Sequence, residues 1–188
     1  MVIRDDLIYR QVFTLKDGAR VLVRPMIEED RQVLLDLFLP IGQDEKRYIR
    51  HDVTDPRTIE QWIDELDYDI VLPLVAEVNN HLIGVASLHF RCGPARHRAE
   101  IRIFLAKNFR QRGVGTRMLS GLIELARRKG LDILEVEIVS DQSHLIKAFQ
   151  YLGFHTACTL EDFYILPDGE LLDVHLLTLR LRENSREF

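Results

Sequence analysis

The sequence is most informative between residues 101 and 119, where it reads IRIFLAKNFRQRGVGTRML. Residues 98–105 predict a strand, a turn with Gly113 and Gly115 follows, and residues 114–129 have the apolar spacing of a helix. Because glycine has no side chain, the backbone N–H groups of such a turn can converge on an anion, which the positive end of the helix dipole also favours. The segment therefore predicts a strand, a turn and a helix that bind a diphosphate.

Two other phosphate-binding loops do not fit this turn. A P-loop ends in Gly-Lys-Ser/Thr, whereas Thr116 and Arg117 follow Gly115 here. The dinucleotide-binding pattern needs a third glycine where Met118 stands. Two glycines alone are equally well explained by a tight turn that binds nothing. The rest of the sequence has to decide between a binding loop and a simple turn.

The elements around this unit predict a mixed α and β chain. Alternating apolar residues indicate strands, apolar residues at helical spacing indicate helices, and glycine, proline or asparagine marks the turns. The helix 114–129 connects two strands, which predicts one parallel pair with a right-handed crossover in a sheet that is mostly antiparallel. The predicted strands are residues 8–15, 19–24, 69–78, 81–90, 98–105, 133–139, 156–166 and 171–181, and the helices are residues 28–39, 58–66, 114–129 and 142–152.

Length and composition indicate one globular domain over residues 1–188. Hydrophobic residues make up 46% and charged residues 29% of the chain, without repeats or linkers. No apolar run is long enough to span a membrane and the N-terminus does not resemble a signal peptide, so we expect a cytoplasmic protein with no membrane partner. The net charge of -5 argues against a broad nucleic-acid-binding surface. Two separated cysteines cannot form a disulfide framework or a four-thiolate metal site.

Two motifs resemble the GNAT superfamily of N-acetyltransferases. Residues 110–115, Arg-Gln-Arg-Gly-Val-Gly, match its Arg/Gln-x-x-Gly-x-Gly/Ala signature, and Ile103 and Leu105 stand at its aliphatic strand positions. Residues 149–154, Phe-Gln-Tyr-Leu-Gly-Phe, are similar to the family's Leu-Tyr-x-Lys-Leu-Gly-Phe ending of a helix. The resemblance covers nearly the whole chain. It implies an α+β fold in three α/β/α layers, with about four helices, one splayed parallel strand pair and an extra N-terminal hairpin.

The resemblance implies that acetyl-CoA is the co-substrate. The backbone groups of Ile103, Phe104 and Leu105 would then pair with the two amides of pantetheine. The physical reason is that in the GNAT fold the strand corresponding to 98–105 splays away from the strand corresponding to 133–139, which leaves backbone groups that a ligand can satisfy. The Leu105 N–H, or that of a neighbour, would also stabilise the oxyanion that forms on the thioester. The remaining implied cofactor-binding residues are Arg110, Gln111, Arg112, Gly113, Val114, Gly115, Thr116, Phe149, and Gln142 or its neighbour Ser143.

Direct attack on a thioester requires a neutral amine, so a side chain has to accept the amine's proton. Glu100 is our candidate for this general base, because many relatives carry a glutamate near this point, but Glu135 and Glu137 share one face of the next strand and are alternatives. The chain departs from the family at Phe149, where many relatives have a tyrosine that protonates the CoA thiolate. Tyr151 is rotated by roughly 200° around the helix and should face elsewhere. Water or another residue has to protonate the thiolate, or the activity is altered.

The resemblance implies that the acceptor is an amine, either a protein lysine or a small molecule. The family builds this site from the first two helices, their loop and the closing hairpin; here the loop contains Tyr48, Arg50 and His51. Residues 14–25, with Glu29 and Asp30 beyond them, look like the start of the GNAT domain in bacterial protein-lysine acetyltransferases, which favours a protein lysine slightly. Dimers through a sheet edge are common in the superfamily, so a homodimer is compatible with the resemblance.

Three other interpretations have weaker support. His89, Cys92 and His97 have no fourth ligand and no standard zinc spacing, so we expect no metal site. A nucleotide-binding protein without thioester chemistry is disfavoured by the mismatched phosphate loops. The alternative that remains is a non-catalytic regulatory module that binds acyl-CoA, which the missing tyrosine at position 149 motivates.

Overall fold

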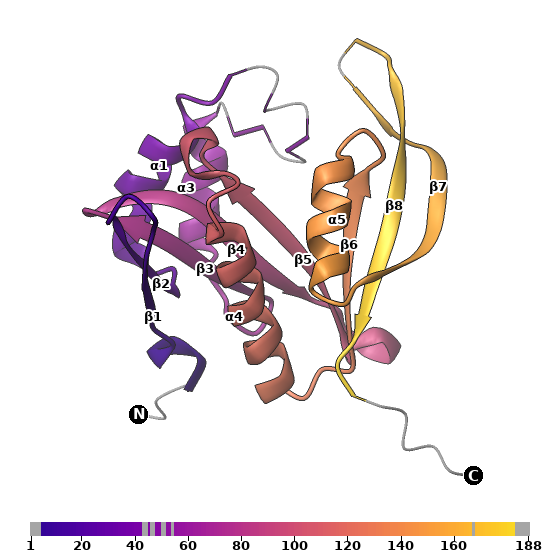
Figure 1. The fold of residues 1–188 in the computed structure, drawn as a ribbon, viewed down its shortest axis with the longest axis horizontal. Coiled ribbons are helices and arrows are strands. Elements are labelled where there is room, and N and C mark those ends of the chain that lie inside the picture. Colours follow the sequence, from indigo (N-terminus) through magenta and orange to yellow (C-terminus); the bar gives the residue numbers. More distant parts are fainter. Residues whose placement is uncertain are drawn as a thin grey trace. The chain divides into compact units, whose positions relative to one another are not determined.

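A computed structural model describes residues 5–42, 45, 48–49, 52–53, 55–166 and 168–182 of the chain. These residues form two compact units, one comprising Met1–Leu88 and Arg102–Leu122 and the other His89–Ile101 and Ile123–Phe188. The chain passes between the units within strand β4, strand β5 and helix α4. Strands β1, β2 and β3 and helices α1 and α3 belong to the first unit, and β6, β7, β8 and α5 belong to the second; Figure 1 labels these elements. The single domain over residues 1–188 stays a prediction.

The sheet has the predicted mixture of strand directions. Its eight strands follow the order β1-β2-β3-β4-β5-β6-β8-β7. Strands β5 and β6 are parallel, while β1–β2, β2–β3, β6–β8 and β7–β8 pair antiparallel. The α+β fold with one parallel pair is therefore confirmed. The strands are β1 (Gln11–Thr14), β2 (Arg20–Pro25), β3 (Val71–Val78), β4 (His81–Phe90), β5 (Arg98–Leu105), β6 (Ile133–Val139), β7 (His155–Ile165) and β8 (Leu171–Arg180).

The first unit begins with the predicted hairpin β1–β2. Gly18 has φ 87° in its turn, and Asn79 and Asn80 have φ 50° and 63° between β3 and β4, as the tight-turn chemistry of these residues predicts. Helix α1 (Arg31–Phe38) follows a 3₁₀ turn at Glu28–Asp30. Helix α3 (Pro56–Asp64) begins with a proline at its first position and is capped by the Asp55 carboxylate, which accepts the Arg57 N–H.

The core of the first unit lies between α1, α3 and strands β3 and β4. Its buried residues are Met26, Leu34, Leu37, Phe38, Ile41, Val53, Ile59, Ile63, Val75 and Leu82. Phe38 of α1 joins this core to Trp62 of α3, with ring centroids 5.5 Å apart, and to Phe104 of β5, with centroids 5.0 Å apart. These aromatic contacts fix the end of β5 against the two helices.

Helix α4 (Val114–Arg128) ends at Gly130, which has φ 76°, as predicted for a C-terminal glycine. In the second unit, helix α5 (Ser143–Tyr151) also ends before a glycine, Gly153, which has φ 94°. A side chain at Gly153 would contact Leu179 of β8 at 3.4 Å, so α5 covers one face of the β6–β8 pair (Figure 1).

Several predicted bounds differ from the structure by two or three residues, for example in α1, α3 and β3, and two segments also differ in their local conformation. Ile8 was expected at the start of a strand, but it ends a 3₁₀ turn over Asp5–Ile8, and β1 begins only at Gln11. Strand β7 has register shifts between Thr156 and Cys158 and between Leu160 and Tyr164, where Asp162 takes φ 51°. Such bulges insert unpaired residues that alternation alone does not reveal. Pro167 of the predicted β7–β8 turn lies outside the described residues, while Gly169 of that turn has φ 88°.

Candidate cofactor and catalytic site

The backbone of β5 has one edge turned toward β4. The Arg91 N–H donates to the Arg98 carbonyl over 3.1 Å, and the Ala106 N–H donates to the Ile83 carbonyl over 2.9 Å. Successive residues of a strand direct their N–H and C=O groups to opposite edges. The even-numbered residues from 98 to 106 therefore face β4, and the odd-numbered residues present their backbone groups on the second edge.

The second edge of β5 pairs with β6 only at its start. The parallel register runs from Arg98 opposite Ile133 to Glu100 opposite Glu135, whereas β5 itself continues to Leu105. Ile103 and Leu105 belong to the odd-numbered set and lie beyond this register. Their backbone groups therefore lie on the second edge, where the Leu105 carbonyl accepts a hydrogen bond from Arg110 Nε, and their contacts with pantetheine stay a prediction.

Phe104 is placed differently from its two neighbours. Its number is even, and its carbonyl oxygen would lie 2.9 Å from a Cβ added to Gly84 of β4, so its backbone faces β4. Its side chain packs on Phe38 instead. Of the three predicted pantetheine-binding residues, Phe104 is the one whose backbone groups point away from the second edge.

The turn before α4 holds two residues in the left-handed region. Gln111 has φ 57° and Gly113 has φ 82°, and both are exposed. For a residue other than glycine, this conformation is less favourable than the right-handed one by roughly 1–2 kcal/mol. Strained backbone of this kind clusters at ligand-binding sites. Where right-handed and left-handed backbone conformations alternate, neighbouring N–H groups point to one side and form an anion-binding concavity, called a nest. The sequence predicted a glycine turn at Gly113 but not the conformation of Gln111, and the binding of a diphosphate here stays a prediction.

The two glycines of the turn have different environments. A Cβ at Gly113 would meet nothing within 4 Å, so this residue leaves space at the turn. A Cβ at Gly115 would lie 3.1 Å from Leu105 Cδ1 and 3.7 Å from Ile103 Cδ1, so Gly115 lets the first turn of α4 pack on the end of β5. Val114 between them is fully buried and anchors the helix, while Thr116 is exposed at its start. Glycine at 113 therefore provides an unusual backbone conformation and glycine at 115 a close approach.

Each arginine of the signature is held by a distant carboxylate and an aromatic ring. Arg110 forms an ion pair with Glu45, and its guanidinium lies 5.9 Å from the centroid of the Phe104 ring. Arg112 forms an ion pair with Asp17 in the β1–β2 turn. The guanidinium of Arg112 also lies 5.3 Å from the centroid of the Phe109 ring. The two ion pairs span 65 and 95 residues of sequence, so no local pattern could have revealed Glu45 and Asp17.

The pKa of Asp17 is lowered by this environment. The largest cause is the hydrogen bond that the Asp17 carboxylate accepts from the Ala19 N–H, and the hydrogen bond from Arg112 adds to it. The carboxylate is therefore charged at neutral pH and keeps Arg112 at the loop. The neighbouring Arg117 lies over the Phe13 ring of β1 at 5.6 Å, so the N-terminal hairpin contacts two arginines near the glycines.

The candidate base Glu100 lies in a buried charged cluster of the second unit. Glu100 is 2% exposed and its carboxylate lies 3.4 Å from the guanidinium of Arg91. Glu135, opposite it on β6, binds Arg91 at 3.0 Å and Arg98 at 2.7 Å. Both carboxylates mark the last registered pair of β5 and β6. Glu100 thus lies at the last registered pair of β5 and β6, in contact with Arg91, and its role as a general base stays a prediction.

Glu137 lies two residues further along β6 and is only half-buried. Its carboxylate accepts a hydrogen bond of 2.7 Å from the hydroxyl of Tyr164 on β7. Glu135 and Glu137 share one face of the strand, as predicted from the two-residue period. The structure brings all three glutamates to neighbouring positions, and the choice among them stays a hypothesis.

Comparison with known proteins identifies the family. Residues 35–154 match the sequence profile of the Acetyltransferase (GNAT) family, which is well over half of the chain. The chain belongs to the GNAT acetyltransferase family. The match includes both motifs discussed above, the loop of residues 110–115 and the helix ending at residues 149–154.

Known relatives agree with this assignment. An uncharacterized N-acetyltransferase of Methanocaldococcus jannaschii is 27% identical over 138 residues, which are 70% of this chain and 59% of that protein. The chain therefore spans 59% of the length of this curated relative. A ribosomal-protein-alanine N-acetyltransferase from Brucella melitensis is 26% identical, with a TM-score of 0.73 over 84% of this chain and 98% of that one. The Salmonella typhimurium protein yncA, solved with its cofactor acetyl-CoA, is 22% identical with a TM-score of 0.72 over 88% and 96%, and shares the GNAT fold.

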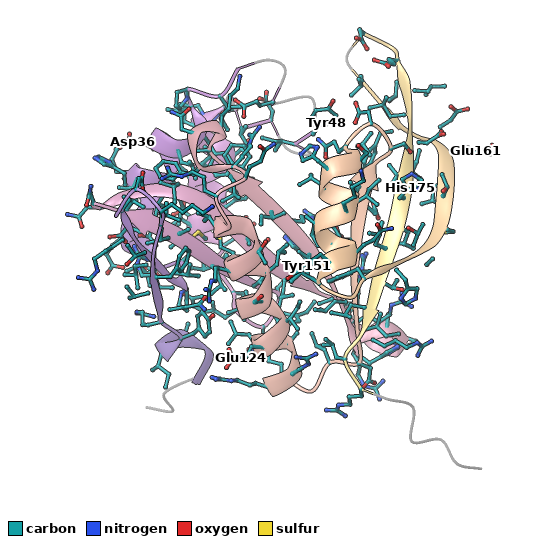
Figure 2. The ribbon with its side chains drawn as sticks, viewed as in Figure 1. Asp36, Tyr48, Glu124, Tyr151, Glu161 and His175 are labelled. Carbon is teal, nitrogen blue, oxygen red and sulfur yellow. The ribbon has the colours of Figure 1, made fainter. Side chains whose placement is uncertain are left out.

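The helix α5 shows how this GNAT chain departs from the family pattern. Phe149 is 1% exposed and packs edge-on against Phe154, with centroids 5.1 Å apart. Tyr151 is 86% exposed on the surface of α5, so it faces elsewhere, as predicted (Figure 2). Gln142 is the half-buried N-terminal cap residue of α5, and the exposed Ser143 begins the helix. Their contacts with acetyl-CoA stay predictions.

The sequence also singled out several residues of the loop after α1 and two cysteines. Tyr48 is half-buried in the segment between α1 and α3, while Arg50 and His51 lie outside the described residues. Cys92 and Cys158 are both exposed thiols. Among the described residues, no group of three or more His, Cys, Asp or Glu side chains could hold a metal ion. None of the described helices combines the length and apolar character needed to cross a membrane.

Proposed function

We propose that the chain is an N-acetyltransferase that moves the acetyl group of acetyl-CoA to an amine by direct attack in a ternary complex. The observation that carries this proposal is the pairing of two backbone features in one unit. The second edge of β5 presents the backbone of Ile103 and Leu105 beyond the β6 register, and the turn before α4 places Gln111 and Gly113 in the left-handed region. The first suits a ligand with amides and the second suits a diphosphate, which is the combination found in CoA.

The acetyl-CoA site follows from these two features. Pantetheine lies along the second edge of β5 and makes hydrogen bonds with the backbone of Ile103 and Leu105 in the manner of an added strand. The N–H groups of Gln111 to Thr116 bind the diphosphate at the N-terminus of α4. Gly113 has the space this requires, because nothing lies within 4 Å of the position of its missing Cβ.

The chain's residues then act on the attacking amine and on the thioester, which supplies the activated acetyl group. Glu100, directly or through a water molecule, accepts a proton from the amine so that the nitrogen lone pair can attack the carbonyl carbon. The Leu105 N–H donates to the carbonyl oxygen as its negative charge grows. The C–N bond forms, the nitrogen loses its surplus proton to water, the C–S bond breaks, and water or another side chain gives a proton to the sulfur, because Phe149 has no proton to give.

The acceptor class is a primary amine, with a protein amine favoured over a small one. The opening residues 14–25 resemble those of protein-lysine acetyltransferases, and the Brucella melitensis relative is named as an enzyme of ribosomal-protein alanine. Both support an acceptor presented by a protein. The assay described next distinguishes a lysine side chain from an N-terminal amine.

The test is a thiol-release assay of acetyl-CoA with a panel of lysine peptides, N-terminal peptides and small amines. We expect CoA release above the rate without acceptor for at least one class, and stabilisation of the protein against heat by acetyl-CoA. The competing proposal, a non-catalytic acyl-CoA-binding module, is motivated by the buried Phe149. It gains if acetyl-CoA stabilises the protein but no acceptor releases CoA. Stabilisation by ATP or NAD without stabilisation by CoA would contradict both proposals.

A further inference from the structure

Arg110 makes three contacts that together reach back over the end of β5. Its Nε donates to the Leu105 carbonyl oxygen over 2.9 Å. Its guanidinium lies over the Phe104 ring at 5.9 Å, and its terminal nitrogen forms an ion pair with Glu45. The side chain is therefore directed at the strand and at Glu45, although its position in the signature suggested cofactor binding.

The Leu105 carbonyl is a sensitive place for such a contact. The peptide plane between Leu105 and Ala106 is held at both ends, because the Ala106 N–H donates to Ile83 over 2.9 Å while the Leu105 oxygen accepts from Arg110. Only the φ and ψ angles of Leu105 connect this plane to the one that carries the Leu105 N–H. A fixed carbonyl therefore restricts the direction of the N–H, which is the proposed oxyanion donor.

Glu45 connects this arrangement to the first two helices. It belongs to the segment between α1 and α3, and 76% of its side chain is shielded from solvent, since 24% is exposed. Phe104 makes a second connection through Phe38 of α1 to Trp62 of α3. Arg110 therefore bridges the end of the cofactor strand and the segment that GNAT proteins use near the acceptor.

Arg112 provides the contrast within the same motif. Its contacts are with Asp17, whose side chain is 55% exposed, and with the Phe109 ring. Neither residue belongs to β5. Two arginines two positions apart thus form similar ion pairs, but only Arg110 joins its ion pair to a backbone carbonyl of the strand.

We propose that Glu45 and Arg110 are positioning residues for acetyl transfer. Glu45 orients the guanidinium of Arg110, Arg110 Nε holds the Leu105 carbonyl, and the Leu105 N–H is thereby aimed at the thioester oxygen. This inference rests on the proposed acetyl transfer for its kinetic consequence. The placement of Leu105 itself is a property of the protein alone.

The kinetic test compares Glu45→Gln with Asp17→Asn and with Asp64→Asn, which breaks the unrelated Arg31–Asp64 pair between α1 and α3. Misdirecting one oxyanion donor without removing it should lower kcat by about 10-fold in Glu45→Gln, while the Kd for CoA stays within about 2-fold. Arg110→Lys keeps the charge but loses the Nε donor, so its kcat should fall by a similar factor. The kcat of Glu45→Asp should lie between those of Glu45→Gln and the wild type. Asp64→Asn should leave kcat and Kd unchanged, and Asp17→Asn should leave kcat unchanged.

An equal fall of kcat in Glu45→Gln and Asp17→Asn would overturn the proposal. So would a change in the Kd for CoA without a change in kcat. A second measurement needs no activity and separates this inference from the proposed function. In ¹⁵N-labelled protein without ligand, Glu45→Gln should shift the Leu105 amide resonance and leave that of Gly113 in place. An unmoved Leu105 resonance contradicts the inference even if the transferase activity is confirmed, and a shifted one supports it even if no acceptor is found.

Discussion

Two regions differ in the kind of atom they present to a ligand. They are the glycine-containing turn before α4 and the glutamates of β5 and β6. At the turn, the atoms we propose as functional are backbone N–H groups, and Gln111 and Gly113 have left-handed conformations. On the strands, the atoms we propose as functional are carboxylates; Arg91 and Arg98 form ion pairs with Glu135, and Arg91 also forms one with Glu100. A backbone site depends on conformation, whereas a carboxylate site depends on its charged neighbours. Changes at the first should affect cofactor binding, and changes at the second should affect turnover.

The largest effect is expected for Glu100→Gln. Loss of a general base lowers kcat by roughly 100-fold or more, and the uncharged amide keeps the size of the buried side chain. Steady-state kinetics with saturating acetyl-CoA measure this effect, and the Kd for CoA should stay within about 3-fold because Glu100 is not part of the glycine turn. Glu137→Gln is the matched comparison. A 100-fold loss in Glu137→Gln with near-normal turnover in Glu100→Gln would transfer the role to Glu137.

Gly113→Ala tests the turn against a glycine of similar conformation elsewhere. Gly113 and Gly169 have φ 82° and 88°, and nothing lies within 4 Å of an added Cβ at either position. Alanine should cost each variant roughly 1–2 kcal/mol of unfolding free energy because of its positive φ. Only Gly113→Ala should also weaken CoA binding, by about 10-fold, since it changes the loop that approaches the diphosphate.

Calorimetric titration of both variants with CoA gives the Kd for CoA. Chemical denaturation of both variants gives the free energy of unfolding. If Gly169→Ala weakens CoA binding as much as Gly113→Ala, the loss comes from reduced stability in general. If neither variant binds CoA less well, the turn at Gly113 is only a turn.

Phe149→Tyr should have a smaller effect than the two changes above, and the effect should be on the stability of the fold. Phe149 is 1% exposed and packs on Phe154, so a hydroxyl added there is buried and should cost about 1–3 kcal/mol unless it gains a hydrogen-bond partner. Thermal unfolding measures this loss. Tyr151→Phe is the control, since an 86% exposed side chain should be replaceable without change in Tm or kcat. A fall in kcat for Tyr151→Phe would identify Tyr151 as the proton donor to the thiolate and contradict our placement of its side chain.

The smallest effect concerns pH and Asp17. Its pKa in the folded protein lies below the ordinary value of 3.8, so its contribution to stability is fully present above that value and is lost as the pH falls through the folded pKa. The difference in Tm between wild type and Asp17→Asn should therefore be constant above about pH 5 and should shrink below pH 3.8. Melting curves between pH 3 and 7 measure it. A difference that grows toward low pH would contradict the assigned direction.

The fold was largely predictable because its elements follow local patterns. Residues 98–105 and 133–139 were predicted as strands, and the structure has β5 and β6 at the same positions. Glycines at 113, 130 and 153 have the positive φ angles expected of helix ends and turns. The bulges of β7 were not predictable, since the sequence of one strand does not show which of its residues is left unpaired by the neighbouring strand.

The candidate site was predictable only where a single residue type reveals the geometry. Gly113 is visible in sequence because glycine is favoured at positive φ, but the same conformation at Gln111 is not. The direction of the Phe104 backbone depends on the register with β4, which no local pattern contains. Glu45 and Asp17 reach the signature arginines from 65 and 95 residues away, so only the folded chain reveals them.

A crystal structure of the protein with bound CoA tests the central claim most directly. We predict diphosphate oxygens within hydrogen-bonding distance, about 2.7–3.2 Å, of backbone nitrogens from Gln111 to Thr116, and pantetheine amides at the same range from Ile103 and Leu105. CoA bound elsewhere, or β5 paired to another strand along the edge that carries Ile103 and Leu105, would contradict the account.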